Sequence, residues 1–325
     1  MKTIGFILYA LKGTKDMIFI QILLLAVGFF LLVKGADWFV EGTSQIARKF
    51  GIPQLVVGLT IVAMGTSMPE AAVSITAALK HNAGITIGNV VGSNILNILI
   101  ILGLTALIAT LKIQKSTLKY EIPYMIFVTF VLLFMGYTDA SISFIEGVIL
   151  WVLFILYLIY LFVLAKNGND EDDTPVSDKS IFQLLLYAVV GGIIVVWGSD
   201  ITVDSATEIA RMIGLSERFI GLTIVALGTS LPELVTSLTA AKKGNADIAI
   251  GNIVGSNIFN ILFVIGTSAL IIPIIFEANF LIDTIIAIVT GVILWLGVLR
   301  TKTLRRPCGI FMLLCYAAYF VYLLL

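Results

Sequence analysis

The sequence predicts an all-α polytopic membrane protein, with ten transmembrane helices arranged as two inverted five-helix repeats. Hydrophobic residues make up 59% of the 325 residues and charged residues only 12%, whereas soluble domains contain about 25% charged residues. Apolar runs of about 17–25 residues recur along the chain, which is the length a helix needs to cross a bilayer. A long internal repeat also divides the chain into two similar halves.

Polar breaks separate the candidate spans and set the domain boundaries. In order, the spans are 17–41, 52–79, 84–109, 120–138, 143–165, 181–205, 214–241, 246–273, 279–299 and 307–325. We expect residues 17–165 to form the first five-helix repeat and residues 181–325 the second. The acidic segment 166–180 has the composition of a solvated linker, and residues 1–16 form an N-terminal extension of uncertain role.

Positive charge is distributed unequally between the two sides of the membrane. If the gaps between spans alternate in side, one side receives thirteen Lys and Arg residues and the other six. The positive-inside rule then places the acidic linker in the cytoplasm and both termini outside, for a protein of the plasma (inner) membrane. The net charge of zero does not indicate nucleic acid, and no obligatory protein partner is implied beyond the lipid bilayer.

The two halves match at a constant offset of 163 residues. Between Gly58–Gly103 and Gly221–Gly266, 31 of 46 positions are identical without a gap. Because each copy holds five spans, the second copy enters the membrane in the opposite sense. Inverted repeats are typical of secondary transporters, which hold their substrate near the midplane where the repeats meet.

Each copy carries a proline and a glutamate in the middle of an apolar span, in GTSMPE (65–70) and GTSLPE (228–233). Proline has no backbone N–H and clashes with the carbonyl one turn earlier, so we expect it to release the carbonyls of Gly65 and Gly228. Loose carbonyls are tolerated in a membrane where they line a cavity. An ionisable residue at this depth is functional by default, so Glu70 and Glu233 predict a cation site.

The residues beside the glutamates suit a hard cation. The hydroxyls of Thr66, Ser67, Thr229 and Ser230 lie within one helical turn of a glutamate. Carboxylates, hydroxyls and backbone oxygens are the ligands of calcium, whereas zinc or copper would call for His or Cys. We expect no cofactor, and the metal ions to be transported ions rather than resident ones.

A second motif follows in each copy, GNVVGSNILN (88–97) and GNIVGSNIFN (251–260). Polar residues spaced by four share one helix face, and we expect the cavity to be lined by Ser93, Asn97, Ser256 and Asn260. Two further asparagines, Asn89 and Asn252, suit either the cavity or bonding between helices. Asp37 and Asp200, near the ends of the first and sixth spans, are expected to be caps or gate contacts.

At these two motifs the sequence resembles the sodium/calcium exchanger family of the cation/calcium antiporter superfamily, in its prokaryotic form with two α-repeats. The resemblance implies that Glu70 and Glu233 are the central calcium ligands. It implies sodium sites built from Thr66, Ser67, Ser93, Thr229, Ser230, Ser256 and the backbone oxygens of Ala63 and Ala226. It also implies that the first and sixth spans slide against the remaining helices.

The sequence departs from this family at one position. Where many members carry Asp, this chain has Asn260, and it also has Asn97 at the matching position of the first copy. Glu70 and Glu233 then supply two formal negative charges, which one calcium ion or two sodium ions neutralise. The three-for-one exchange usual in the family does not follow from this sequence, and potassium co-transport is not expected.

Three alternatives to sodium/calcium exchange remain open from the residues. Protons could compete for the two neighbouring carboxylates, which would make the chain a proton/calcium antiporter. A cation channel could also use a polar midplane. An intramembrane hydrolase would need different roles for two near-identical glutamates, so the sequence favours a transporter over an enzyme.

Overall fold

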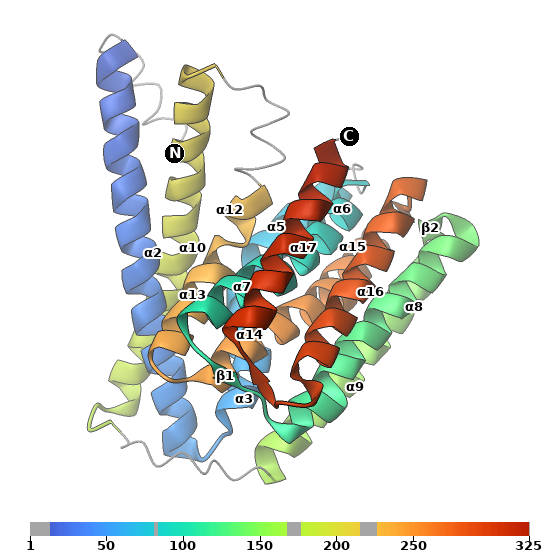
Figure 1. Cartoon of the computed structure of the whole chain (residues 1–325), viewed down its shortest axis with the longest axis horizontal. Coiled ribbons are helices and arrows are strands. Elements are labelled where there is room, and N and C mark those ends of the chain that lie inside the picture. The colour runs from blue at the N-terminus through green and yellow to red at the C-terminus, as the bar shows by residue number, and fades with distance from the viewer. Residues whose placement is uncertain (1–13, 81–83, 168–176, 215–225, 325) are drawn as a thin grey trace.

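The chain is a multi-pass integral membrane protein. We describe a computed structural model, which covers residues 14–80, 84–167, 177–214 and 226–324 (Figure 1). Within these ranges, eight helices are long and apolar enough to cross a membrane. A ninth span is a pair of helices, Gln54–Thr66 and Met68–Leu79, bent by 50° at a short break.

Nine of the ten expected spans coincide with described helices or with the bent pair. The span expected at 214–241 lies partly outside the described residues, so the count of ten is not reached here. Its described part consists of α12 (Ala226–Thr229) and α13 (Leu231–Lys242). Most of the N-terminal extension, residues 1–13, and much of the acidic linker, residues 168–176, also lie outside the description.

The two halves of the chain contain matching elements at the same offset of 163 residues. In the first half these are α4 (Ala63–Thr66), α5 (Met68–Leu79), a π-helical turn η2 (Asn97–Leu102), α7 (Gly103–Ile108) and β1 (Leu111–Lys112). Their counterparts are α12, α13, η5 (Asn260–Ile265), α15 (Gly266–Ile271) and β3 (Ile274–Ile275). The sequence repeat is therefore a repeat of local structure, down to the irregular turns.

Two long helices, α2 (Thr14–Phe50) and α10 (Ile181–Met212), lie side by side and run in opposite directions (Figure 1). Glycines allow their backbones to approach closely. A Cβ atom at Gly35 would lie 2.8 Å from the backbone nitrogen of Val195, and one at Gly42 would lie 2.5 Å from that of Ala188. Small residues at such crossings permit the dense packing that holds membrane helices together.

Both long helices continue beyond the spans expected at 17–41 and 181–205. Apolar side chains such as Ala47 and Ala210 keep a buried face at helical spacing after the apolar run has ended. Asp37 and Asp200 therefore lie inside helices, and the expectation that they act as caps is wrong. Instead, the Asp37 carboxylate pairs at 2.7 Å with Lys243, which follows α13.

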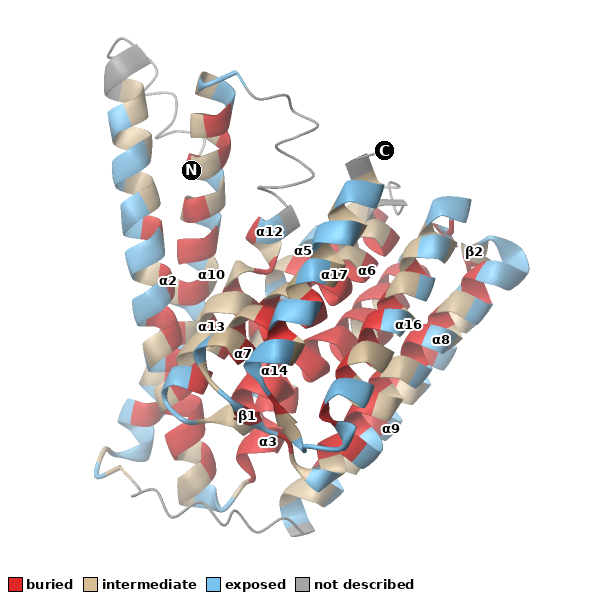
Figure 2. Ribbon diagram, in the orientation of Figure 1, coloured by how far each residue is buried: buried red, intermediate tan, exposed pale blue. Residues whose placement is uncertain are grey.

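The centre of the molecule is formed by two helical runs that each contain a π-helical turn, as the buried residues in Figure 2 show. One run is α6 (Gly84–Leu96) with η2 and α7, and the other is α14 (Ala246–Phe259) with η5 and α15. In the Ala246–Ile271 span, 94% of the most apolar window is buried, against 11% in Arg306–Leu323. The Ala246–Ile271 span is therefore central and the Arg306–Leu323 span is peripheral.

The outer helices are α8 (Ile122–Asp139), α9 (Phe144–Asn167), α16 (Ala278–Leu299) and α17 (Arg306–Leu324). They expose large apolar side chains, among them Phe130, Phe162 and Leu296, as expected for surfaces that face lipid. Two short antiparallel β-pairs join the halves at the helix ends: β1 with β4 (Thr303–Leu304), and β2 (Ser141–Ile142) with β3.

Candidate ion-binding site

A break between two short helices positions the proline–glutamate motif of each half. In the first half α4 ends at Thr66 and α5 begins at Met68, with Ser67 at the junction. Pro69 lies in the first turn of α5, where a missing N–H leaves no helical bond unmade. The proline therefore starts the second helix of the pair rather than distorting a continuous one.

The carbonyl groups expected to be released by the prolines differ between the halves. The carbonyl of Gly228 accepts a hydrogen bond of 2.9 Å from Ser199 Oγ on α10. The matching position in the first half is Ala36, which has no side-chain donor. The two halves of the site are therefore similar but not equivalent.

The two glutamates are fully buried and each is contacted by a serine from the other half. Ser67 Oγ donates to Glu233 Oε1 at 2.7 Å, and Ser230 Oγ donates to Glu70 Oε1 at 3.2 Å. Both carboxylates have a relative exposure of 0%. Among the described residues, no lysine or arginine forms an ion pair with either of them.

Four buried oxygens at the two motifs have no hydrogen-bond partner among the described residues: Oε2 of Glu70, Oε2 of Glu233, Oδ1 of Asn97 and Oδ1 of Asn260. A buried polar group without a partner costs about 1–3 kcal/mol. All four are acceptor atoms, which a cation or a hydrogen-bond donor would satisfy.

Asparagines fix the backbone that carries each glutamate. Asn89 Nδ2 donates to the carbonyl of Glu70 at 3.2 Å and to Ser74 Oγ at 2.9 Å. Asn252 makes the same two bonds to Glu233 at 3.3 Å and to Ser237 at 2.8 Å. Of the two roles expected for these asparagines, the structure shows bonding between helices.

Other expected site residues lie in the same network. Thr66 Oγ1 contacts Asn252 Oδ1 at 2.9 Å, and Ser256 Oγ donates to the carbonyl of Ala63 at 3.3 Å. Asn260 Nδ2 reaches Ser93 Oγ at 3.4 Å. Thr229 and Ala226 lie in α12, directly before Ser230.

Sequence reasoning missed a clasp between the second motifs of the two halves. Asn94 Nδ2 donates to the carbonyl of Asn257 at 3.1 Å, and Asn257 Nδ2 donates to the carbonyl of Asn94 at 3.0 Å. The side-chain oxygens of this pair accept bonds from Asn97 and Asn260. The identity of Asn94 and Asn257 in the two copies was a sequence signal for this pair. However, the position of a residue on one helix face does not reveal which residue of another helix it contacts.

We expect Asn257→Ala to destabilise the fold. The substitution removes two bonds, one to the backbone of Asn94 and one from Asn97. Each interhelical bond in a membrane protein contributes about 0.6 kcal/mol and at most about 1.7 kcal/mol. Thermal unfolding of the purified protein would show a lower midpoint, and an unchanged midpoint would contradict the role of the clasp.

Both halves of the site lie in segments that match a known protein family. The family model described as sodium/calcium exchanger protein matches residues 20–163 and 183–325, which includes every element of the site. The chain belongs to the sodium/calcium exchanger protein family. The two matched segments leave out the acidic linker and agree with the two halves seen in the structure.

Several relatives of this exchanger-family chain match over most of their length. Sodium/calcium exchanger MaX1 of Methanosarcina acetivorans is 34% identical and is covered to 99%, with 94% of this chain matched. Inner membrane protein YrbG of Escherichia coli is 36% identical, covering 88% of that protein and 84% of this chain. A solved structure of the sodium-calcium exchanger NCX_Mj, soaked with zero Na⁺ and Ca²⁺, superposes with a TM-score of 0.82 at 34% identity. The alignment covers 94% of this chain and 99% of that structure.

Proposed function

We propose that this chain is a secondary antiporter that exchanges sodium for calcium by alternating access, with both ions competing for one midplane site. The observation that carries the proposal is the pair of fully buried glutamates, each bonded to a serine of the other half and each with one unpartnered oxygen. The similarity to proteins named as sodium/calcium exchangers supports the same ions.

The charge of the site explains how exchange would be coupled. Glu70 and Glu233 carry two negative charges when ionised, and no described basic residue neutralises them. One calcium ion or two sodium ions would do so. A site that cannot hold both ions at once moves each only in exchange for the other.

The proposed ligands form an all-oxygen set drawn from both halves. They are the side chains of Glu70, Glu233, Thr66, Ser67, Thr229, Ser230, Ser93, Ser256, Asn97 and Asn260 and the backbone oxygens of Ala63 and Ala226. Flexible coordination by six to eight such oxygens at about 2.3–2.6 Å is typical of calcium.

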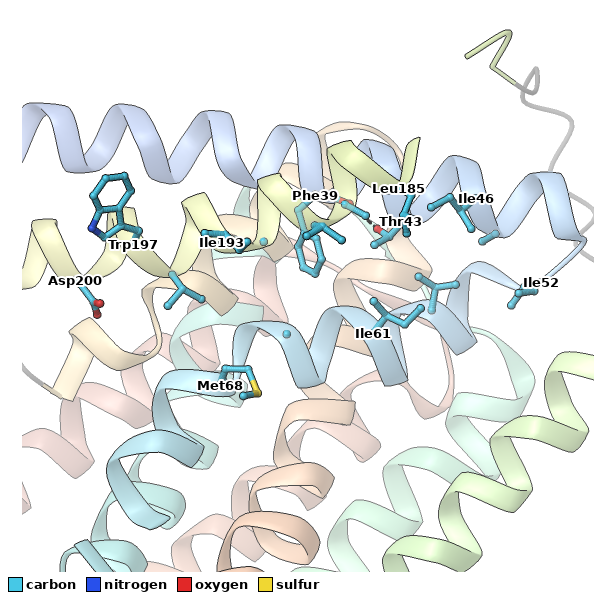
Figure 3. Close-up of a pocket in the computed structure, with 17 residues that line it drawn as sticks. Phe39, Thr43, Ile46, Ile52, Ile61, Met68, Leu185, Ile193, Trp197 and Asp200 are labelled. Carbon is cyan, nitrogen blue, oxygen red and sulfur yellow. Dashed lines mark hydrogen bonds between the residues drawn. The ribbon is translucent and has the colours of Figure 1, made fainter. Parts of the chain in front are cut away.

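The packing of α2 and α10 supports a sliding mechanism. A cavity of about 740 Å³ lies between this pair and the bent span, lined mostly by apolar side chains such as Phe39, Ile61 and Ile193 (Figure 3). Apolar contacts carry no directional bonds, so helices can shift along them at low cost. We propose that α2 and α10 move together along this surface.

The membrane topology is proposed on the same basis. Residues 17–165 and 181–325 would be inverted repeats joined by the cytoplasmic linker 166–180, with both termini outside the inner membrane. Two features in Figure 1 support this arrangement. The first helices of the two halves, α2 and α10, run in opposite directions. The start of α2 also lies on the same side of the molecule as the end of α17.

Calcium uptake into proteoliposomes tests the function directly. Purified protein is reconstituted, and uptake is driven by an outward sodium gradient or, in parallel, by an outward proton gradient without sodium. Uptake that requires sodium supports the proposal. Uptake driven by protons alone would identify a proton/calcium antiporter, and calcium flux without either gradient would identify a channel.

A quantitative prediction concerns competition between the two ions. Because two positive charges are needed to replace one calcium ion, the apparent calcium dissociation constant should rise with sodium concentration with a logarithmic slope of about two or more. Equilibrium binding of radioactive calcium at increasing sodium, with choline holding ionic strength constant, measures the slope. An affinity independent of sodium would contradict a shared site.

A further inference from the structure

A second cluster of buried, unpartnered oxygens lies outside the proposed exchange site. It occupies the start of α8 and the π-helical turn before it, η3 (Thr117–Glu121), together with α9. Four of its atoms have no hydrogen-bond partner among the described residues: Ser116 Oγ, Thr117 Oγ1, Glu121 Oε2 and Tyr157 OH. The exchange site shows the same signature in Glu70, Glu233, Asn97 and Asn260.

Glu121 is at the centre of the second cluster. Its relative exposure is 0%, and Tyr160 on α9 donates its hydroxyl to Oε1. The hydroxyls of Ser116 and Thr117 lie close to the carboxylate, and Tyr157 lines the same cavity as Glu121. No described lysine or arginine forms an ion pair with Glu121.

Other contacts hold the backbone of the cluster in place. In the π-helical turn the carbonyl of Leu118 would accept from residue 123, but Pro123 has no N–H. The indole of Trp295 on α16 supplies the missing donor, at 2.9 Å from that carbonyl. The four unpartnered oxygens are therefore not needed to fix the turn, and π-helical turns are frequent at functional sites.

A cavity on the outer face of the protein adjoins the cluster. A cavity of about 420 Å³ is lined by Glu121, Tyr157 and Tyr160, and also by the exposed Lys119. Lys119 lies near the start of the Thr117–Asp139 span. An ion from the aqueous boundary on this side would not have to pass through the exchange site.

We propose that Glu121, Thr117, Ser116 and Tyr157 form a second cation-binding site that takes a sodium ion. One carboxylate balances one positive charge, whereas a calcium ion would leave an uncompensated charge in the membrane. The hydroxyl oxygens would provide the remaining ligands. The site lies on different elements from the exchange site, so this proposal does not rest on the transport proposed above.

The test measures the thermal unfolding midpoint in sodium chloride against choline chloride, in calcium-free buffer and detergent. To remove the exchange site, the full chain carries Glu70→Gln and Glu233→Gln. We expect sodium still to raise the midpoint, since a ligand that binds only the folded state stabilises it. Adding Glu121→Gln should abolish this rise.

A matched control is available in the same chain. Asp283 on α16 accepts a hydrogen bond from Tyr319 at 3.1 Å, which is also a tyrosine–carboxylate pair within a span, but neither residue has an unpartnered buried oxygen. Asp283→Asn in the same background should leave the sodium-dependent rise intact. A rise that is absent before Glu121 is changed, or that survives Glu121→Gln, would overturn the proposal.

Tyr157→Phe separates ion binding from a structural role if Glu121→Gln fails to fold. Removing an unpartnered buried hydroxyl should leave the midpoint in choline unchanged or raise it. If Tyr157 is an ion ligand, the same variant should need a severalfold higher sodium concentration for half of the rise. An unchanged sodium response would remove Tyr157 from the site and overturn the proposed ligand set.

Discussion

Glu70→Gln or Glu233→Gln should abolish calcium transport while the protein remains folded. The amide keeps the shape of the side chain but removes one of the two charges that would balance calcium. Loss of one charge of a buried, bonded pair typically costs 2–5 kcal/mol, about 30-fold to several thousandfold in affinity. Calcium uptake into sodium-loaded proteoliposomes measures the effect.

Glu146→Gln provides the control for this pair of variants. Glu146 belongs to the first turn of α9, where its carboxylate accepts bonds from the backbone and hydroxyl of Ser143. The substitution also neutralises one glutamate, but Glu146 lies outside the proposed site, so calcium uptake should persist. Substantial uptake in either Glu70→Gln or Glu233→Gln would exclude that residue as a central ligand.

The second large effect is expected at the crossing of α2 and α10. In Gly191→Ala the new methyl group would lie 2.5 Å from the backbone nitrogen of Phe39 and 2.8 Å from the carbonyl oxygen of Gly35. Neither atom belongs to a flexible side chain, so the two helices must separate. Overpacking of this kind costs about 1–3 kcal/mol, and thermal unfolding in detergent should show a clearly lower midpoint.

The adjacent glycine supplies a matched comparison. A Cβ atom at Gly192 would lie 3.5 Å from the ring of Phe39, which is ordinary van der Waals contact. Alanine is also favoured over glycine in a helix by about 1 kcal/mol, so Gly192→Ala should leave the midpoint unchanged or raise it. Equal unfolding midpoints for the two variants would refute the idea that close backbone packing holds α2 and α10 together.

Much of the architecture could be predicted from the sequence because lipid imposes a strict length and composition on each span. Nine of the expected spans match described helices or the bent pair, and the break at GTSMPE followed from Pro69. The ends of α2 and α10 could not be predicted from hydropathy. Beyond the apolar runs these helices continue because side chains such as Ala47 and Ala210 remain buried against other parts of the protein.

The candidate site was predictable in its residue types but not in its pairings. A period of 3.6 residues places Ser67 and Glu70 near one another on a helix, yet it says nothing about which residue of another helix they meet. The contact of Ser67 with Glu233 spans 166 residues of sequence. The clasp of Asn94 with Asn257 was missed for the same reason.

The reciprocal bonds of Ser67 with Glu233 and of Ser230 with Glu70 make the two halves of the chain depend on each other. Each copy of the repeat holds its own carboxylate but leaves the serine contact to the other copy. Neither copy alone therefore contains a complete site, and a half produced by itself would leave its glutamate without the serine contact. The two copies are also not interchangeable, because Ser199 of the second half supplies a donor where Ala36 of the first half has none.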